Sequence, residues 1–555
     1  MSIFSKTTAI LASFVSGLVL NTVTATSTVA AEDILFLYTP VRLSLSIDSL
    51  TEFAESGTIN PDLDFYLRLA DATEEETIAF QERLNQSIKV DPVRLSRLLN
   101  SRLGEDFLSR LGHIINIQGG SNGKFPLRGA LINAAFDPEG LSFIGFLREL
   151  PVNIEINVRE LQDMVDRINT VVDATILFSE EIIRLASQEI QMTPTVDYSQ
   201  LPDLTQPGEY RVTQETWMLT DPSRDRSFRV LVYYPQGELN PDTPVVIISH
   251  GLGSPPEDFG WIATYLASYG YLVAIPQHRG SDFTQVENLL DGLTRSLPIT
   301  EEFVDRPLDI SFVLDELEKR NQSQFNGKLE LTRVGLFGHS FGGYNILALA
   351  GATIDFNHLE QECDLTRMTG NTSLLLQCRA LELDRKEYNF QDERIAAVYA
   401  ANPVNSAVFG PSGLAKISVP VFIAAGNFDP ATPFIFEQVS SFPWLTTDKK
   451  YLLLQEGQAH VDFSKIDADF NNLIQAHINI TLPPPELLHK YTRATTLAFL
   501  QRHLVGDAEY EVFLQSAYLD YLSTNQPFRA YLITRASSEE LNEGIEQFKR
   551  ERGIR

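Results

Sequence analysis

The chain has 555 residues, of which 43% are hydrophobic and 10% aromatic, a composition typical of well-packed globular proteins that excludes a disordered one. Its 44 basic and 73 acidic side chains give a formal net charge of -29, which disfavours nucleic acids and anionic membrane surfaces as partners because both repel an acidic protein. The length suits roughly two to four domains.

The first 31 residues have the pattern of a secretory signal peptide. Lys6 precedes a short apolar stretch, TTAILASFVSGLVL, and a run of small residues then ends at Ala31. Because the apolar stretch is short and rich in Ser and Thr, we expect cleavage near Ala31 rather than a retained anchor helix. No later run is apolar for long enough to span a bilayer, so the sequence predicts an exported protein, periplasmic or secreted, without an integral membrane span after cleavage.

Residues 32–192 have helical patterns and are predicted to form an all-α domain. An N-cap residue followed by proline starts three of the segments, at Asn60, Asp91 and Asp137. Thr73 and Glu76 stand at the spacing of a capping box. The region contains no recognisable nucleophile, metal-ligand cluster or phosphate-binding loop, so we assign it no catalytic role.

The pattern changes after this helical region. Residues 193–208 contain three prolines and are predicted to be an inter-domain linker. From 209 to 507, short apolar runs such as PVVIISH, YLVAIPQH, RVGLFGH and VPVFIAAGNFD alternate with helical patterns. This alternation predicts an α/β fold, a mostly parallel sheet covered by helices on both faces. Residues 508–555 are predicted to be a C-terminal helical extension.

Residues 338–342, GHSFG, match the G-x-S-x-G pattern around Ser340. The strand-like run RVGLF precedes the match and the helix-like run NILALAG follows it, which is the context in which the pattern carries meaning. The flanking glycines allow a sharp turn that projects the Ser340 hydroxyl. A tight connection without chemistry is the alternative, but the surrounding alternation of strands and helices favours a nucleophile.

A serine hydroxyl is a weak nucleophile, so a base and a carboxylate are needed to activate it. In this kind of fold the chain order is serine, acid, histidine. His460 stands in EGQAHVDF, directly after the strand-like run KKYLLLQ, and is the predicted base. The other histidines that follow the serine and a plausible acid fall in polar or helical stretches, at His477, His489 and His503.

Asp429 is the predicted acid, because it ends the strand-like run VFIAAGNFD and two nearby prolines fix the turn that follows. A helix N-cap is the alternative role for this side chain. If Asp429 is not the acid, Asp462 and Asp467 are the next candidates.

Two backbone N–H groups are needed to stabilise a developing oxyanion. One is expected from Phe341, the residue after the predicted nucleophile. The other is expected from Leu252, because the glycines at 251 and 253 leave its amide free to approach the site. A simple glycine-rich turn is the alternative.

Residues 352–392 interrupt the alternation with a polar segment that contains both cysteines of the chain, Cys363 and Cys378. The even count in an exported chain favours one disulfide, with two free thiols as the alternative. Because the segment follows the helix after Ser340, we expect a lid beside the site that limits substrate size.

The motifs SHGLGS, YLASYGYLVAIPQHRGSD, DRPLDISFVLDEL and GHSFGGY resemble the α/β-hydrolase superfamily over about residues 205–505. Within it they resemble platelet-activating-factor acetylhydrolases and dienelactone-hydrolase-like esterases. The resemblance implies an α/β-hydrolase fold with Ser340 as nucleophile, His460 as base, and Leu252 and Phe341 as oxyanion donors. Residues 32–192 resemble a domain of unassigned function found ahead of exported bacterial α/β-hydrolases.

One position departs from the acetylhydrolase pattern. Acetylhydrolases of this type place their acid after the strand that follows the nucleophile helix, whereas the corresponding run here, RIAAVYAANP, ends in Asn402-Pro403. Asp429, one strand later, is the commoner position in the superfamily. The departure argues against phospholipid specificity and leaves ester hydrolysis intact.

The sequence therefore predicts an exported serine hydrolase that cleaves a small-molecule ester or lipid through an acyl-enzyme, without a cofactor. A metal hydrolase is disfavoured because H-E-x-x-H and clustered Cys/His are absent from the sequence. A serine peptidase on the same fold is one alternative. A non-catalytic binding protein on a hydrolase scaffold is the other, although such a scaffold has no physical need for serine, acid, base and oxyanion loop together. The oligomeric state is left open.

Overall fold

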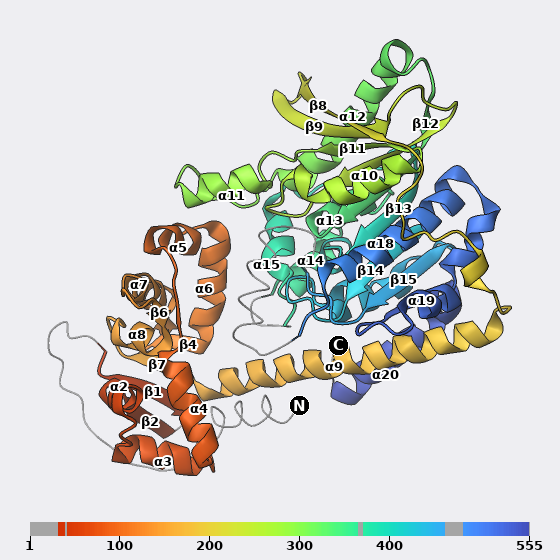
Figure 1. Cartoon of the computed structure of the whole chain (residues 1–555). Coiled ribbons are helices and arrows are strands. Elements are labelled where there is room, and N and C mark those ends of the chain that lie inside the picture. Colours follow the sequence, from red (N-terminus) through yellow and green to blue (C-terminus); the bar gives the residue numbers. More distant parts are fainter. Residues whose placement is uncertain (1–30, 39–40, 365–369, 461–480, 554–555) are drawn as a thin grey trace. The chain divides into compact units, whose positions relative to one another are not determined.

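The computed structural model describes residues 31–38, 41–364, 370–460 and 481–553 (Figure 1). The chain divides into two compact units: unit 1 comprises residues 1–170 and 287–297, and unit 2 comprises residues 171–286 and 298–555. The predicted signal peptide lies outside the described residues except for Ala31. Within the described ranges, every helix falls short of the length and apolar character that crossing a bilayer requires.

Unit 1 contains a five-stranded sheet in the order β2-β1-β7-β4-β5. Its strands are β1 (Asp33–Tyr38), β2 (Val41–Ser46), β4 (Ile115–Ile117), β5 (Ser121–Asn122) and β7 (Ile154–Asn157), and a separate pair is formed by β3 (Ser87–Ile88) and β6 (Leu141–Ser142). The expectation of an all-α domain is therefore wrong. Most of these strands are too short to show a two-residue period in the sequence, and tertiary pairing decides their conformation.

Helices nevertheless make up most of unit 1. They are α2 (Ile47–Ser56), α3 (Pro61–Leu69), α4 (Glu74–Asn85), α5 (Pro92–Leu99), α6 (Arg102–Ile114), α7 (Lys124–Ala134) and α8 (Phe143–Arg148). The capping box predicted at Thr73 and Glu76 is confirmed at the start of α4. The helix start predicted at Asp137 is wrong, because its carboxylate accepts the Glu139 N–H in a turn and α8 begins only after Ser142.

Helix α9 (Val158–Met192) is 35 residues long and continues from unit 1 into unit 2, which begins at Val171. Its second half buries Phe178, Ile182 and Leu185 in the core of unit 2. Helical periodicity shows which face of a helix is apolar but not which core that face joins, so the end of the helical pattern at 192 does not mark the division between units.

Unit 2 is built on a nine-stranded sheet in the order β16-β15-β14-β13-β12-β10-β11-β9-β8. Its strands are β8 (Val212–Asp221), β9 (Arg226–Pro235), β10 (Thr243–Ser249), β11 (Leu272–Pro276), β12 (Leu329–His339), β13 (Ile395–Ala401), β14 (Val421–Gly426), β15 (Lys450–Gln455) and β16 (Ala530–Thr534). The six central strands are parallel, whereas β8, β9 and β16 pair antiparallel. The predicted mostly parallel sheet is confirmed.

Helices cover both faces of this sheet. Along β10, Val245 and Ile247 join one buried cluster whereas Val246 and Ile248 join another, as alternation across a strand requires. The covering helices include α10 (Gly260–Ser268), α12 (Glu302–Gln324), α13 (Phe341–Leu349), α16 (Ser406–Leu414), α18 (Pro485–Leu500), α19 (Ser516–Ser523) and α20 (Ser538–Arg552), and α11 (Phe283–Leu290) follows β11.

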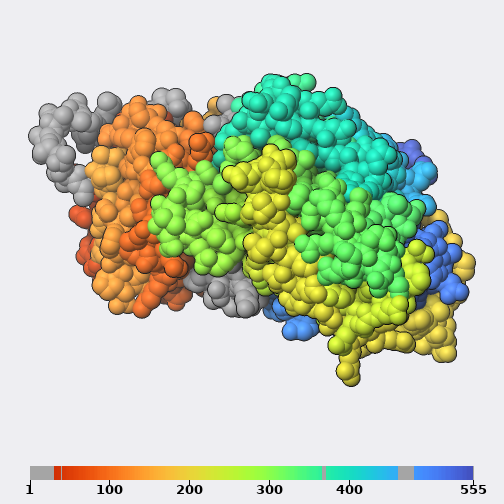
Figure 2. Space-filling model, turned by 90° about the horizontal axis from the view of Figure 1, so that it is seen from above, coloured from red at the N-terminus to blue at the C-terminus, as the bar shows by residue number. Residues whose placement is uncertain are grey.

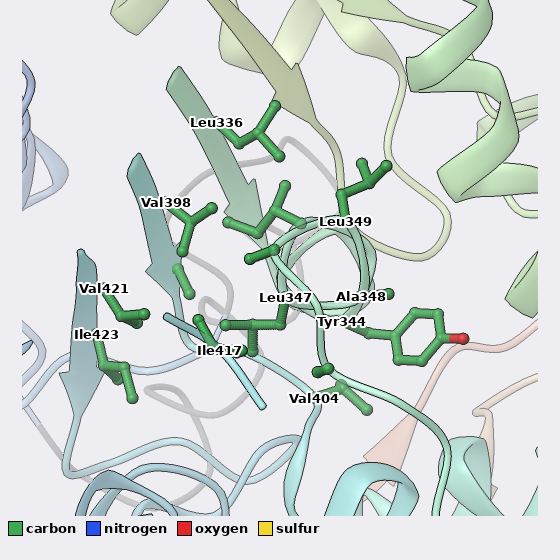
Figure 3. Close-up of a cluster of buried hydrophobic side chains, with 14 of the residues drawn as sticks. Leu336, Tyr344, Leu347, Ala348, Leu349, Val398, Val404, Ile417, Val421 and Ile423 are labelled. Carbon is green, nitrogen blue, oxygen red and sulfur yellow. The ribbon is translucent and has the colours of Figure 1, made fainter. Parts of the chain in front are cut away.

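Helix α13 is buried along its whole length, because its sequence FGGYNILAL is apolar on nearly every side. Figure 3 shows Leu336, Val398 and Val421 of three neighbouring strands on the side of the sheet that faces α13, with Leu347 between the helix and these strands. This packing fixes the start of α13, and with it the residues next to Ser340.

The region after residue 508 is not wholly helical, contrary to expectation. Residues 530–534, AYLIT, form β16 and pair with β15 at the edge of the main sheet. A single short apolar run at the end of a chain has no flanking alternation to reveal it, so only its pairing with β15 identifies it as a strand.

The insertion at 352–392 contains α14 (Phe356–Glu362), α15 (Leu374–Gln377) and a 3₁₀ helix at Cys378–Glu382. The predicted disulfide between Cys363 and Cys378 is present. In the space-filling view the teal atoms of this part of the chain form one continuous area of the visible surface (Figure 2).

Candidate active site

Ser340 lies in a strained turn between β12 and α13. Its backbone has φ 55° and ψ -119°, a conformation that non-glycine residues rarely adopt and that persists only where the surroundings enforce it. A Cβ at Gly338 would lie 2.3 Å from the Gly342 carbonyl oxygen, and one at Gly342 would lie 2.0 Å from the Ser249 carbonyl oxygen. Both glycines are therefore required by the close passage of the backbone.

The structure brings Ser340, His460 and Asp429 into one hydrogen-bonded chain. Ser340 Oγ lies 2.8 Å from His460 Nε2, and His460 Nδ1 lies 2.8 Å from Asp429 Oδ2. The three side chains follow β12, β15 and β14, so they meet at the carboxyl edge of the parallel sheet. An imidazole in this arrangement can take the hydroxyl proton while the carboxylate fixes its tautomer.

The Asp429 carboxylate accepts hydrogen bonds at both oxygens. Oδ2 accepts from His460, from Asn402 Nδ2 at 2.7 Å and from Thr432 Oγ1 at 2.6 Å, and Oδ1 accepts two backbone N–H groups of the following turn. Burial alone would raise the pKa of Asp429, but the charge of His460 and these hydrogen bonds hold the pKa below its usual value. The carboxylate thus closes a turn and also binds the imidazole; the alternative of a helix N-cap is wrong, because the helix Ile435–Val439 has Phe434 at its N-cap.

Asn402 is a site residue whose role sequence reasoning missed. It directly follows β13 with a positive φ of 44°, donates to Asp429, and accepts from Gln458 Nε2 at 3.2 Å. The sequence showed only that a carboxylate is absent there. The amide instead orients the carboxylate of the next strand.

His339, the residue before Ser340, was also missed. Its Nε2 lies 2.9 Å from the backbone oxygen of His460, and the two imidazole rings are 4.9 Å apart. Burial, with a smaller contribution from repulsion by His460, lowers the pKa of His339 to about 3, so the ring is neutral and its Nε2–H donates to that oxygen. This contact fixes the main chain that carries His460.

Two residues were predicted to supply the oxyanion donors: Leu252, in the loop after β10, and Phe341, which follows Ser340. Residues 250–253 pass beside the serine, since a Cβ at Gly251 would lie 3.3 Å from Ser340 Cβ. Phe341 is the first residue of α13, where helix N–H groups have no intrahelical partner. Neither N–H donates to any acceptor in the described part of the chain.

A second Asp-His-Ser array lies beneath the turn. His278 Nδ1 is 3.2 Å from Asp309 Oδ2 and its Nε2 is 3.0 Å from Ser249 Oγ, which also accepts from Asn345 Nδ2 at 3.0 Å. All four side chains are fully buried, so no substrate reaches this serine. The array ties β10, β11 and α12 together under the candidate site.

The remaining histidines that were considered as bases lie elsewhere. His489 stacks on Trp261, and buried His503 lies 3.0 Å from the Tyr451 hydroxyl. His477, Asp462 and Asp467 lie outside the described residues.

The insertion is anchored beside the site through a buried carboxylate. Glu437 accepts from Asn371 Nδ2, Ser373 Oγ and Gln377 Nε2 of the insertion, and also from the backbone N–H groups at the start of α16. Thr372 donates to the Pro430 carbonyl, next to the predicted acid. The insertion therefore contacts the loop that follows β14.

Replacing both cysteines by serine, C363S/C378S, is expected to lower the free energy of unfolding by about 3 kcal/mol, the chain-entropy estimate for a loop of this size. If the insertion limits substrate size, the ratio of kcat/KM for a long-chain ester to that for an acetate ester should also rise. Denaturant titration and steady-state kinetics measure the two effects. An unchanged ratio with lowered stability would make the bridge a structural clip only.

Four buried histidines predict that acid destabilises unit 2. Burial lowers the pKa of His339 and His503 to about 3 and places those of His250 and His278 well below the usual value. In the unfolded chain these groups take up protons below about pH 6.5. The unfolded state therefore binds more protons, and the free energy of unfolding should fall as the pH drops from about 6.5 towards 3.

Two buried carboxyls oppose this trend without cancelling it. Burial raises the pKa of Glu302 to about 7 and raises that of Asp309, so their protonation favours the folded state as the pH falls. Denaturant titrations at several pH values test the balance. His503→Phe should make the slope below pH 6 shallower by about 1.4 kcal/mol per pH unit, the value for one proton. A slope identical to that of the wild type would contradict the assignment for His503.

Two families match parts of the chain. Residues 30–157 match a family described as an alpha/beta hydrolase of unknown function, and residues 231–289 match platelet-activating factor acetylhydrolase, isoform II. A search of the curated proteins finds no match. The second match spans β10, residues 250–253 and β11 but ends before Ser340. These matches support a hydrolase that acts on esters, and together with the nine-stranded sheet they give the chain the fold of an α/β hydrolase and a resemblance to the platelet-activating factor acetylhydrolases.

Proposed function

We propose that this protein is a serine hydrolase that cleaves carboxylic esters through an acyl-enzyme. The observation that carries the proposal is the chain Ser340–His460–Asp429, with 2.8 Å at each hydrogen bond and the serine in a strained turn at the carboxyl edge of the sheet. The partial match to an acetylhydrolase family supports an ester or lipid of small-molecule size as the substrate.

In the proposed reaction, Ser340 Oγ bonds to the ester carbonyl carbon while His460 Nε2 takes the hydroxyl proton. The carbonyl oxygen becomes anionic and accepts from the N–H groups of Leu252 and Phe341. Collapse of the intermediate expels the alkoxide, which receives the proton from His460. A water molecule then gives a proton to His460 Nε2 and attacks the acyl carbon. Collapse of this second intermediate releases the carboxylic acid, and the proton returns from His460 to Ser340.

Asp429 stabilises the imidazolium that forms in each step. Its pKa lies below the usual value, so the carboxylate is charged throughout the neutral pH range. The same contact keeps the proton of neutral His460 on Nδ1 and leaves Nε2 free to accept from the serine.

We also propose that the protein is exported. The N-terminal pattern that ends at Ala31 and the disulfide between Cys363 and Cys378 both support this location. Mass spectrometry of the protein recovered from periplasm and medium tests it, through the mass of the mature N-terminus and of the bridged peptide. A chain that keeps its first 31 residues and carries two free thiols in the cytoplasm would refute it.

The function is tested with a substrate panel. p-Nitrophenyl esters of graded acyl length, short-chain and long-chain phospholipids, and peptide amides should be compared by kcat/KM, together with labelling by a fluorophosphonate. We expect hydrolysis of esters and labelling at Ser340. Preferential cleavage of peptides would make the protein a peptidase, and the absence of both hydrolysis and labelling would leave a binding protein on a hydrolase scaffold.

A further inference from the structure

Arg306 of α12 is fully buried and contacts the backbone beside the proposed oxyanion donors. Nη1 donates to the His250 carbonyl at 2.7 Å, and Nη2 donates to the Gly251 carbonyl at 3.4 Å. Nε donates to Ser281 Oγ at 2.8 Å. A guanidinium is a planar fork with fixed donor directions, so three such contacts define the position of residues 250–253 relative to α12.

The imidazole ring of His250 also binds the Gly251 carbonyl. The His278 backbone N–H donates to His250 Nε2 at 3.1 Å, so the ring proton must be on Nδ1, which lies 2.9 Å from the Gly251 oxygen. Burial is the main cause, and the charge of Arg306 the second, that lowers the pKa of His250 well below its usual value. The ring therefore stays neutral and keeps this tautomer.

The direction of the Leu252 N–H follows from these contacts. The Gly251 carbonyl and the Leu252 N–H belong to one planar trans peptide, in which they point in opposite directions. Three donors bind the Gly251 carbonyl, namely Arg306 Nη2, His250 Nδ1 and, at 3.4 Å, the Ser254 N–H, so the Leu252 N–H points away from them. The next N–H, that of Gly253, donates to the Ser281 carbonyl at 2.7 Å. This bond prevents rotation of the peptide units on either side of Leu252.

Arg306 also contacts the residue that carries the second proposed donor. Its guanidinium carbon lies 4.5 Å from the centroid of the Phe341 ring, a cation–π distance. Phe341 packs in turn against Phe303 of α12, with 4.9 Å between ring centroids. One side chain thus connects the loop after β10 with the first residue of α13.

We propose that Arg306, assisted by His250, is a positioning residue that aims the two backbone N–H groups of the oxyanion hole. This inference rests on the proposed esterase function. It adds that the electrostatic stabilisation of the intermediate depends on a buried arginine that touches neither substrate nor nucleophile.

A purely structural role in the acidic cluster of α12 is the competing explanation. Arg306 Nε lies 3.7 Å from Glu302, whereas Arg226 approaches Glu302 and Asp309 at 2.8 Å each. The close ion pairs of the cluster are therefore made by Arg226 and by Arg224, which lies 2.9 Å from both Asp305 and Asp309. The short contacts of Arg306 are made with backbone carbonyls and Ser281, which favours positioning of the loop.

Arg306→Lys tests the proposal, because it keeps the charge and removes the planar fork. We expect kcat to fall roughly 10²–10³-fold, the loss typical of one oxyanion donor, with KM little changed. The inhibition constant of an alkyl boronic acid, whose tetrahedral adduct places an oxygen in the oxyanion hole, should rise in parallel. Arg226→Lys is the matched control: it perturbs the same cluster and should lower the melting temperature without a comparable loss in kcat.

His250→Phe is a second variant that leaves Arg306 in place and decides the question if Arg306→Lys does not fold. It should lower kcat less than Arg306→Lys, again with KM little changed. Equal losses of kcat in the Arg306 and Arg226 variants, or a rise in KM alone, would overturn the proposal. Wild type and variants should also be labelled with a fluorophosphonate. If the wild type is labelled and active and the variants are fully active, only the role of Arg306 is refuted. If the wild type is neither labelled nor active, the proposed function is refuted, and this inference with it.

Discussion

Ser340→Ala is expected to abolish ester hydrolysis while leaving the fold intact. Truncation of a nucleophile in this kind of triad costs on the order of 10⁴ to 10⁶ in kcat. Among the described residues the hydroxyl bonds to His460 Nε2 alone, and the methyl group of alanine keeps the Cβ that lies beside Gly251. Steady-state hydrolysis of p-nitrophenyl acetate, circular dichroism and fluorophosphonate labelling measure the outcome.

Ser249→Ala is the matched control for this variant, since it removes the serine of the second Asp-His-Ser array. Ser249 is fully buried and its hydroxyl contacts His278 and Asn345. Its loss should lower the free energy of unfolding by about 1–3 kcal/mol, the range for a disrupted buried hydrogen bond, and leave labelling at Ser340 in place. Activity of Ser340→Ala above about a hundredth of the wild-type value would contradict the assigned nucleophile.

Asp429→Asn is expected to lower kcat roughly 10³- to 10⁴-fold, because the amide favours the wrong imidazole tautomer. Oδ1 accepts two backbone N–H groups of the turn, so the asparagine oxygen should stay there and its Nδ2 should take the place of Oδ2. That Nδ2 would face other donors, Asn402 Nδ2 and Thr432 Oγ1. His460 would have to accept at Nδ1 and carry its proton on Nε2, where it cannot take a proton from Ser340.

The pH dependence of kcat/KM and fluorophosphonate labelling rates distinguish this effect from unfolding. Asn402→Ala serves as a control, since it removes one donor to Asp429 while leaving a carboxylate on the imidazole, and its loss of kcat should be far smaller. Turnover of Asp429→Asn close to that of the wild type would show that another acid orients His460, with Asp462 and Asp467 as the first residues to substitute.

Local sequence signals were enough for the parallel strands of the main sheet and for the choice of the three central side chains of the candidate site. Each strand of the parallel sheet is a short apolar run next to a helical pattern, and both signals are contained within about a dozen residues. Ser340, Asp429 and His460 each follow directly on such a run, and in a parallel sheet the carboxyl ends of strands meet at one edge. Proximity of the three could therefore be predicted without a structure, and the structure brings them within hydrogen-bond distance.

Tertiary structure alone decided the residues that support this centre. Arg306 reads in the sequence as one more charge on an amphipathic helix, because the carbonyls that it binds lie more than fifty positions earlier, at 250 and 251. His339 contacts the backbone of His460, and Asn402 donates to a carboxylate in the next strand-loop unit. Long-range contacts also decided the short strands of unit 1 and the strand β16. They likewise decided that the second half of α9 packs in the core of unit 2. Periodicity reports which residues avoid water, whereas the partner of a buried polar group or of a short strand is set by long-range packing, which leaves no local trace in the sequence.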